Sequence, residues 1–214
     1  MSKDKTQKFQ DSVKGNRLRY VHGYFGVALH QLRAHQDVRS TKPYWDWKQF
    51  SEKAATIPFG KKETIWTSGS AILVTQFLQG LFATDKWYSV EKLAEIADKH
   101  GYACWNKRSR YEDVVGGKWF DQLHEIIGLR SEEVFDAKEV IDTQSKSSEL
   151  VVYVLQVRND WFYGVKGLGG CHYMVLMGVQ PNGAMVYDSR TGVNTDRTQK
   201  QILEATMRAW KVSD

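Results

Sequence analysis

The chain has 214 residues, of which 42% are hydrophobic and 13% aromatic, and it carries a formal net charge of +5. These values are typical of a folded chain with one sizeable core, and they exclude a disordered protein. No apolar stretch approaches the roughly 18 residues of a membrane helix, and the polar opening at residues 2–8 is unlike a secretory signal. We therefore expect a soluble protein that is cytoplasmic at synthesis, and export by a route that reads no such signal stays open.

The basic charge is concentrated near the N-terminus. Residues 1–62 carry 13 Lys and Arg against 5 Asp and Glu, whereas residues 63–214 carry 17 against 20. We interpret residues 1–62 as a basic helical extension, with helices over about 5–14, 17–36 and 44–56. Because no groove-reading motif or base-stacking platform is present, we expect no nucleic acid and favour docking of an acidic partner, such as an inhibitor.

The rest of the chain divides into a helical part followed by a sheet. The signals are capping residues, terminating glycines and apolar runs of strand length. The predicted elements are helices over about 70–82, 90–101 and 118–127, a central strand over 150–157, a hairpin over 172–188 and a closing helix over about 196–210.

The hairpin carries a histidine and a carboxylate. His172 opens an apolar run, residues 181–183 read Pro-Asn-Gly, and a second short run ends at Asp188. Strands joined by so short a turn are antiparallel neighbours, so we expect His172 and Asp188 to lie side by side. A histidine oriented by a carboxylate supplies two of the three members of a nucleophilic triad.

The hairpin resembles that of papain-like cysteine peptidases, specifically the bacteriocin-processing, or C39-like, branch. In that family Gly-x-His-Tyr-Val-Val-Val-x-Gly is followed by a turn and Val-Tyr-Asp. Here residues 170–178 read Gly-Cys-His-Tyr-Met-Val-Leu-Met-Gly, and residues 186–188 read Val-Tyr-Asp. The resemblance implies an α+β fold over residues 63–214, a papain-like domain whose helical half packs on an antiparallel β-sheet, forming one compact unit with the extension. It also implies a hydrolase that needs no cofactor or metal, with His172 as base and Asp188 as the residue that orients it.

The family places its nucleophilic cysteine upstream, after a glycine at the start of a buried helix. The corresponding segment here, Thr-Ser-Gly-Ser-Ala at residues 67–71, contains no cysteine. Gly69 and Ala71 favour Ser70 as the nucleophile position, whereas other registers place Ser68 or Ala71 there. A helix start together with a nearby imidazolium lowers a thiol pKa enough to give a thiolate but does not ionise a hydroxyl, so we expect the chain as written to be inactive or nearly so. Whether the serine is natural or an engineered replacement stays open.

The glutamine that this family uses as oxyanion donor is absent from residues 61–66. The candidates for the oxyanion donor or for the cleft lining are therefore Ser68, Gly69, Thr64, Trp66 and Trp161. Trp161 lies in the glycine-rich stretch 159–170, whose make-up suits a loop that lines or gates a cleft.

The two cysteines offer no substitute for the missing thiol. Cys171 is next to His172 on a strand, so its side chain is expected on the opposite face from the imidazole. Cys104 has apolar neighbours and is interpreted as a core residue. A disulfide between them stays open, and neither has the spacing of a metal ligand.

Two functions are compatible with these observations. The first is a thiol hydrolase of peptide or amide bonds, present in a form without its cysteine. The second is a non-catalytic binding domain, or pseudoenzyme, that keeps the cleft. Because the papain-like family includes leader peptidases, effector proteases and cell-wall amidases, a bacterial effector or toxin is among the roles that the resemblance implies. The expected partners are a peptide or protein substrate and an acidic inhibitor or immunity protein.

Overall fold

The computed structural model describes residues 52–82, 84, 86–106, 111–114, 118–134, 136–146, 151–164, 170–180 and 183–213. The helices expected over 5–14 and 17–36 lie outside these ranges. Of the helix expected over 44–56, only its last part is described, as α3, Glu52–Thr56. Ala54, Ile57 and Phe59 of this first described stretch are buried in the core.

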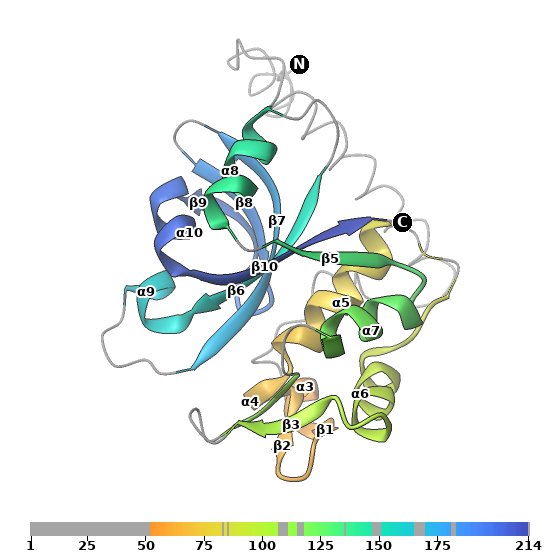
Figure 1. Ribbon diagram of the computed structural model, residues 1–214. Helices are drawn as coiled ribbons and strands as arrows, with labels where there is room; N and C mark the ends of the chain where they lie inside the picture. Colours follow the sequence, from red (N-terminus) through yellow and green to blue (C-terminus); the bar gives the residue numbers. More distant parts are fainter. Residues whose placement is uncertain are drawn as a thin grey trace, which may run out of the picture.

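A six-stranded sheet dominates the second half of the chain (Figure 1). Each neighbouring pair of strands is antiparallel, and β7 and β8 form the expected hairpin. In spatial order the strands are β5 (Arg130–Val134), β10 (Thr206–Ser213), β6 (Val152–Arg158), β7 (Cys171–Gln180), β8 (Gly183–Asp188) and β9 (Gly192–Arg197). Two small antiparallel sheets precede them, β1 (Pro58–Phe59) with β2 (Glu63–Thr64) and β3 (Ala103–Asn106) with β4 (Tyr111–Val114).

Helices cover both faces of the large sheet (Figure 1). Strand β7 shows the division, since Tyr173 and Val175 belong to the apolar cluster on the α5 side, and Met174 and Leu176 to the cluster on the other side. The first side has α4 (Ile65–Ser68), α5 (Ser70–Leu81), α6 (Val90–Lys99) and α7 (Lys118–Ile126). The second has α8 (Ala137–Lys146), α9 (Asn159–Tyr163) and α10 (Gln199–Ala205). The expected α+β class, with a helical half packed on an antiparallel sheet, is confirmed.

Helix α5 is the central helix of the first layer. All twelve of its residues are buried, including the polar Ser70, Thr75, Gln76 and Gln79. Its Phe77 ring stacks on Tyr187 of β8, with centroids 4.0 Å apart. A Cβ on Gly69, which precedes the helix, would lie 2.6 Å from the Cα of Ile65, so only glycine fits there. The close approach of Gly69 to Ile65 lets α5 follow α4 directly.

The prediction of a closing helix over 196–210 is wrong. Only Gln199–Ala205 is helical, and Thr206–Ser213 forms β10 between β5 and β6. Ala209, Trp210 and Val212 are buried there by the sheet on both sides. Pairing with strands that lie about 50 and 80 residues earlier outweighs the local helical pattern.

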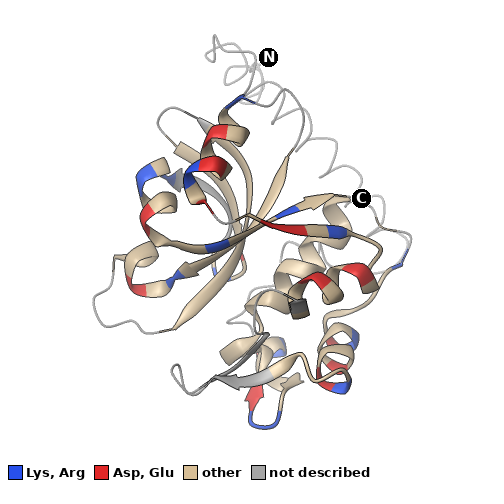
Figure 2. Cartoon of the chain, viewed as in Figure 1, with Lys and Arg blue, Asp and Glu red and all other residues tan. Residues whose placement is uncertain are grey.

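Charged residues are distributed along α6, α7, α8 and α10, while α5 contains none (Figure 2). None of the helices in the described ranges combines the length and apolar character that a membrane crossing requires.

Candidate active site

His172 and Asp188 are paired across the β7–β8 hairpin. Asp188 lies opposite Met174 in the ladder, so His172 is its diagonal neighbour on the same face. The imidazole Nε2 and the Asp188 Oδ1 atom are 2.8 Å apart, and both residues are 0% exposed. The hairpin therefore brings the two side chains side by side, as the sequence predicted.

The Asp188 carboxylate is held by three donors. Oδ1 accepts from His172 Nε2–H and from the backbone N–H of Arg190, each at 2.8 Å, and Oδ2 accepts from the Tyr163 hydroxyl at 2.7 Å. Burial works to raise the pKa of Asp188, but these hydrogen bonds outweigh it and lower the pKa to about 2. The carboxylate is therefore ionised at neutral pH.

The His172 imidazole is neutral. Burial lowers its pKa, and the neighbouring Asp188 opposes that shift without reversing it. Because the carboxylate only accepts hydrogen bonds, Nε2 carries the proton and Nδ1 carries the lone pair. Nδ1 is buried and has no hydrogen-bond partner. The pair thus presents an unused basic nitrogen.

Ser70 is the first residue of α5, and its hydroxyl meets β7 beside His172. The N-cap of the helix is Gly69, so Ser70 does not act as the cap. Its Oγ accepts a hydrogen bond of 3.4 Å from the backbone N–H of Tyr173 and makes none to the imidazole. Ser70 as a whole is 5% exposed. The structure therefore brings Ser70 to the backbone next to His172, without a direct bond between the two side chains.

The alternative nucleophile positions differ in their surroundings. Ser68 ends α4, and its buried Oγ has no hydrogen-bond partner. Ala71 is fully buried in the apolar core. Because the Ser68 hydroxyl makes no hydrogen bond, Ser68 remains an alternative to Ser70 as the nucleophile position.

The expected oxyanion donors are mostly engaged elsewhere. The N–H of Gly69 donates to the Ile65 carbonyl at 3.0 Å, and the N–H of Thr64 donates to Thr67 Oγ1 at 3.0 Å. Trp66 is 37% exposed on α4, and Trp161 is 50% exposed on α9. The Trp161 ring contacts the Arg158 guanidinium, whose carbon lies 4.9 Å from the ring centroid. The geometry therefore selects no oxyanion donor among these candidates.

Two contributors to the site were missed in the sequence, Tyr163 and Arg190. The Arg190 contact had a local signal, since an aspartate often accepts from the backbone N–H two residues later. Tyr163 had none, because its contact with Asp188 spans 25 residues and depends on how α9 packs.

Cys171 does not contribute to the His172–Asp188 pair. Its Sγ lies 3.2 Å from Gln156 Nε2, which also donates to the Tyr173 hydroxyl at 3.0 Å. This agrees with the expected alternation along the strand. The Cys104 side chain lies outside the described part, so the disulfide between the two cysteines stays an untested alternative. Among the described residues, no group of three His, Cys, Asp or Glu side chains is arranged to hold a metal ion.

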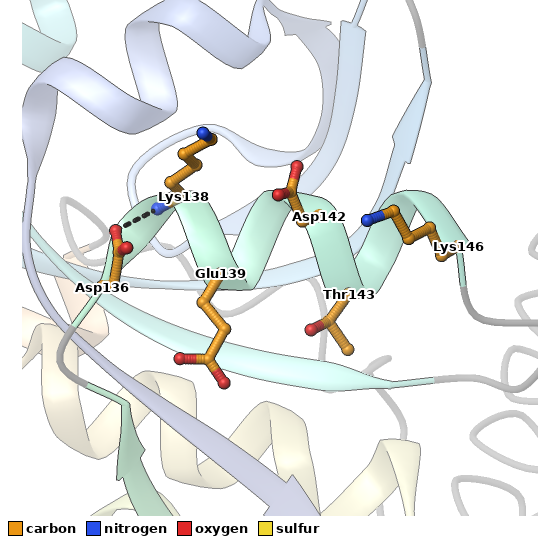
Figure 3. A pocket seen from close by; sticks show the side chains of 6 residues that line it. All are labelled: Asp136, Lys138, Glu139, Asp142, Thr143 and Lys146. Atoms are coloured by element: carbon orange, nitrogen blue, oxygen red, sulfur yellow. Dashed lines mark hydrogen bonds between the residues drawn. The ribbon is translucent and has the colours of Figure 1, made fainter.

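A separate pocket of about 440 Å³ runs along α8 (Figure 3). Its walls carry three carboxylates and two ammonium groups, and the Asp136 carboxylate accepts from the Lys138 backbone N–H at 2.8 Å. The lining residues are Asp136, Lys138, Glu139, Asp142, Thr143 and Lys146. None of them belongs to the candidate active site.

No protein-family model matches the chain, and no curated protein matches it in sequence. Among solved structures, it is similar to the peptidase domain of Streptococcus ComA, a bi-functional ABC transporter of a quorum-sensing pathway (14% identity, TM-score 0.49, covering 72% of this chain and 96% of that one). It is also similar to a double glycine motif protease from an AMS/PCAT transporter, solved in complex with the leader peptide (12% identity, TM-score 0.45, covering 75% of this chain and 94% of that one). A third similar structure is the peptidase domain of Streptococcus mutans ComA (14% identity, TM-score 0.39, covering 58% of this chain and 88% of that one). At these values we base the proposed function on the residues of this chain.

Proposed function

We propose that the chain is a papain-like hydrolase domain for peptide or amide bonds in which Ser70 occupies the place of the nucleophilic cysteine. In this proposal His172 is the base and Asp188 holds it in one tautomer. The observation that carries the proposal is the buried His172–Asp188 hydrogen bond of 2.8 Å, which leaves Nδ1 without a partner, together with the hydrogen bond from Tyr173 N–H that holds Ser70 Oγ at the backbone of the residue after His172. The start of α5 adds the favourable end of a helix dipole.

The hydroxyl is a poor nucleophile in this setting, and the chain as written has little or no hydrolase activity. Ser70 Oγ already accepts a hydrogen bond from Tyr173 N–H and gives no proton to His172. A helix start and a nearby imidazole lower a thiol pKa from near 8.5 to roughly 3.5–7.5, but they do not ionise a serine hydroxyl. A cysteine at position 70 is therefore expected to be reactive.

The first experiment compares Ser70→Cys with Ser68→Cys as a matched control on the other side of Gly69. Each variant is alkylated with iodoacetamide at pH 7, and peptide mass spectrometry separates the new thiol from Cys104 and Cys171. We expect the thiol at position 70 to react at least about tenfold faster than the one at position 68, and to lose that advantage with His172→Ala. Equal rates with and without His172 would contradict the proposal. A faster reaction at position 68 would move the nucleophile to Ser68.

The second experiment asks whether the serine form is itself active. The unmodified chain is incubated with a mixed peptide library, and cleavage is followed by mass spectrometry. We expect no cleavage above that of Ser70→Ala. Cleavage that disappears with Ser70→Ala would show that the chain is a serine hydrolase and that our view of its inactivity is wrong.

A second candidate is a non-catalytic peptide-binding domain. The observation that favours it is the closed site, with His172 and Asp188 0% exposed and Ser70 5% exposed. An inert thiol in Ser70→Cys together with retained binding of a peptide would support this candidate. A role as a bacterial effector or toxin, and an acidic inhibitor or immunity protein as partner of the basic N-terminal segment, stay predictions from the sequence.

A further inference from the structure

The short helix α9 carries a tyrosine to the His172–Asp188 pair. The helix follows β6 and ends at Gly164, whose φ of +66° is the left-handed conformation that glycine favours. Its first residue is tied to the start of β7, because Asn159 N–H donates to the Gly170 carbonyl at 3.3 Å. Phe162 is fully buried in the apolar cluster on this side of the sheet. The helix is thus anchored at both ends, and Tyr163 follows the buried anchor directly.

Tyr163 completes the hydrogen bonding of the carboxylate. Its hydroxyl lies 2.7 Å from Asp188 Oδ2, while Oδ1 serves His172 and the Arg190 backbone. Within the described part of the chain, Tyr163 is the one hydrogen-bond donor to Oδ2. Because Asp188 is 0% exposed, water does not replace that donor in this arrangement.

The phenol is held in place and stays protonated. Its ring lies 6.1 Å from the His172 ring, centroid to centroid, and the guanidinium groups of Arg190 and Arg197 lie 4.9 Å and 5.7 Å from its own centroid. Such cation–π contacts are favourable and fix the ring position. Burial and the Asp188 charge raise the pKa of Tyr163 well above its usual value, so its hydroxyl is a permanent donor at physiological pH.

We propose that Tyr163 is a positioning residue that locks the Asp188 carboxylate, so that Oδ1 stays on His172 Nε2–H and the lone pair of the imidazole stays on Nδ1. A carboxylate held through one oxygen can turn about its Cβ–Cγ bond. A donor on each oxygen prevents that rotation. The inference deepens the proposed function and rests on it for its meaning, since the tautomer of His172 matters to chemistry only if His172 accepts a proton.

The test reads the tautomer directly in the unmodified Ser70 form. Imidazole nitrogens labelled with ¹⁵N are observed by NMR at pH 7.5, and His172→Gln identifies the His172 signals among the six histidines. We expect one nitrogen to be protonated, Nε2, and the other to show a lone pair. Tyr163→Phe removes only the hydroxyl, and we expect the two nitrogen resonances to move toward each other, as averaging between tautomers requires.

Tyr153→Phe is the matched control. Tyr153 is also buried on this side of the sheet and lies opposite Leu176 in the ladder, so the variant removes a buried tyrosine hydroxyl away from the pair. We expect its His172 signals to match those of the parent. Unchanged His172 signals in Tyr163→Phe overturn the proposal, and so does a parent spectrum with the proton on Nδ1.

A second measurement covers the case in which Tyr163→Phe does not fold. Placing 3-fluorotyrosine at position 163 keeps the ring and the hydroxyl but makes the hydroxyl a stronger donor. It draws charge from Oδ2 and weakens the bond from His172 Nε2–H, so we expect the Nε2-bound proton signal to move upfield. The same residue at position 153 should leave that signal in place. No movement with fluorotyrosine at 163 overturns the proposal.

These outcomes are distinct from failure of the proposed function. Thiol labelling at position 70 decides whether the site supports a nucleophile, whereas the nitrogen signals decide what Tyr163 does even if that thiol is inert. Where the thiol is reactive, Tyr163→Phe in the Ser70→Cys chain should lower its alkylation rate about tenfold, the effect expected for one hydrogen bond to a charged group. Tyr153→Phe should leave the rate unchanged.

Discussion

His124 is a buried histidine that the site does not use, and it makes the stability of the protein depend on pH. It lies on α7 with its ring 4.3 Å from that of Phe120, is 0% exposed, and has no hydrogen-bond partner on either ring nitrogen. Burial lowers the pKa of His124 from 6.5 to about 3. The folded chain therefore keeps this imidazole neutral where the unfolded chain protonates it.

The magnitude follows from these two values. Below pH 6.5 the unfolded chain binds one proton more than the folded chain, so the free energy of unfolding falls by about 1.4 kcal/mol for each further pH unit until about pH 3. Between pH 8 and pH 5 the loss from His124 is about 2 kcal/mol. His124→Leu removes this loss. At pH 8 it also removes an unsatisfied buried polar group, which favours the variant by about 1 kcal/mol.

Urea unfolding at pH 8 and at pH 5 measures the effect. The free energy of unfolding of His124→Leu should exceed that of the parent by about 2 kcal/mol more at pH 5 than at pH 8. The matched control is His100→Leu at the exposed end of α6, where the imidazole keeps its contact with water. An advantage of His124→Leu that is the same at both pH values would refute the reasoning, because it would mean that the folded chain accommodates the charged ring.

Three further variants test local contacts that stabilise the fold. Gly69→Ala should lower the free energy of unfolding by about 2–3 kcal/mol, because its Cβ would lie 2.6 Å from neighbouring backbone, whereas Gly101→Ala meets no atom within 4 Å and should cost about 1 kcal/mol through its positive φ alone. Equal urea midpoints for the two would contradict this. Ser89→Ala removes the N-cap of α6 and should lower the free energy of unfolding by about 1 kcal/mol, without changing the slope of that free energy against urea concentration. Arg208→Lys loses the paired bonds of 2.6 and 2.7 Å to Glu133, and thermal unfolding should show a loss of about 1 kcal/mol that shrinks at high salt.

The elements that sequence predicts well are those with complete local signals. The β7–β8 hairpin has apolar strands around a turn, and the start of α5 has a glycine followed by a mostly apolar run. The hairpin predicts that His172 and Asp188 lie near each other. Their position on one face also depends on a β-bulge between Leu176 and Gly178, which shifts the register by one residue and has no signal in the sequence.

The parts that sequence does not predict depend on distant segments. Thr206–Ser213 forms the strand between β5 and β6, and the sequence of that stretch does not indicate which strands it pairs with. The Tyr163–Asp188 contact likewise requires that α9 fold back over β7. The role of Ser70 as a hydrogen-bond acceptor for Tyr173 N–H, in place of a helix cap, depends on how α5 meets the sheet.

The burial of His172 bears on why the residue at position 70 matters. A thiolate at that position is most stable beside an imidazolium, but burial disfavours the charged ring and Asp188 is the group that opposes this. The first-turn N–H groups of α5 have no acceptor within the helix and favour a negative charge at its start. With serine, no negative charge forms, and the neutral imidazole is the form that burial prefers. With cysteine, transfer of the thiol proton to His172 would create both charges at once, so we expect the reactivity of that thiol to depend on Asp188 as well as on the helix.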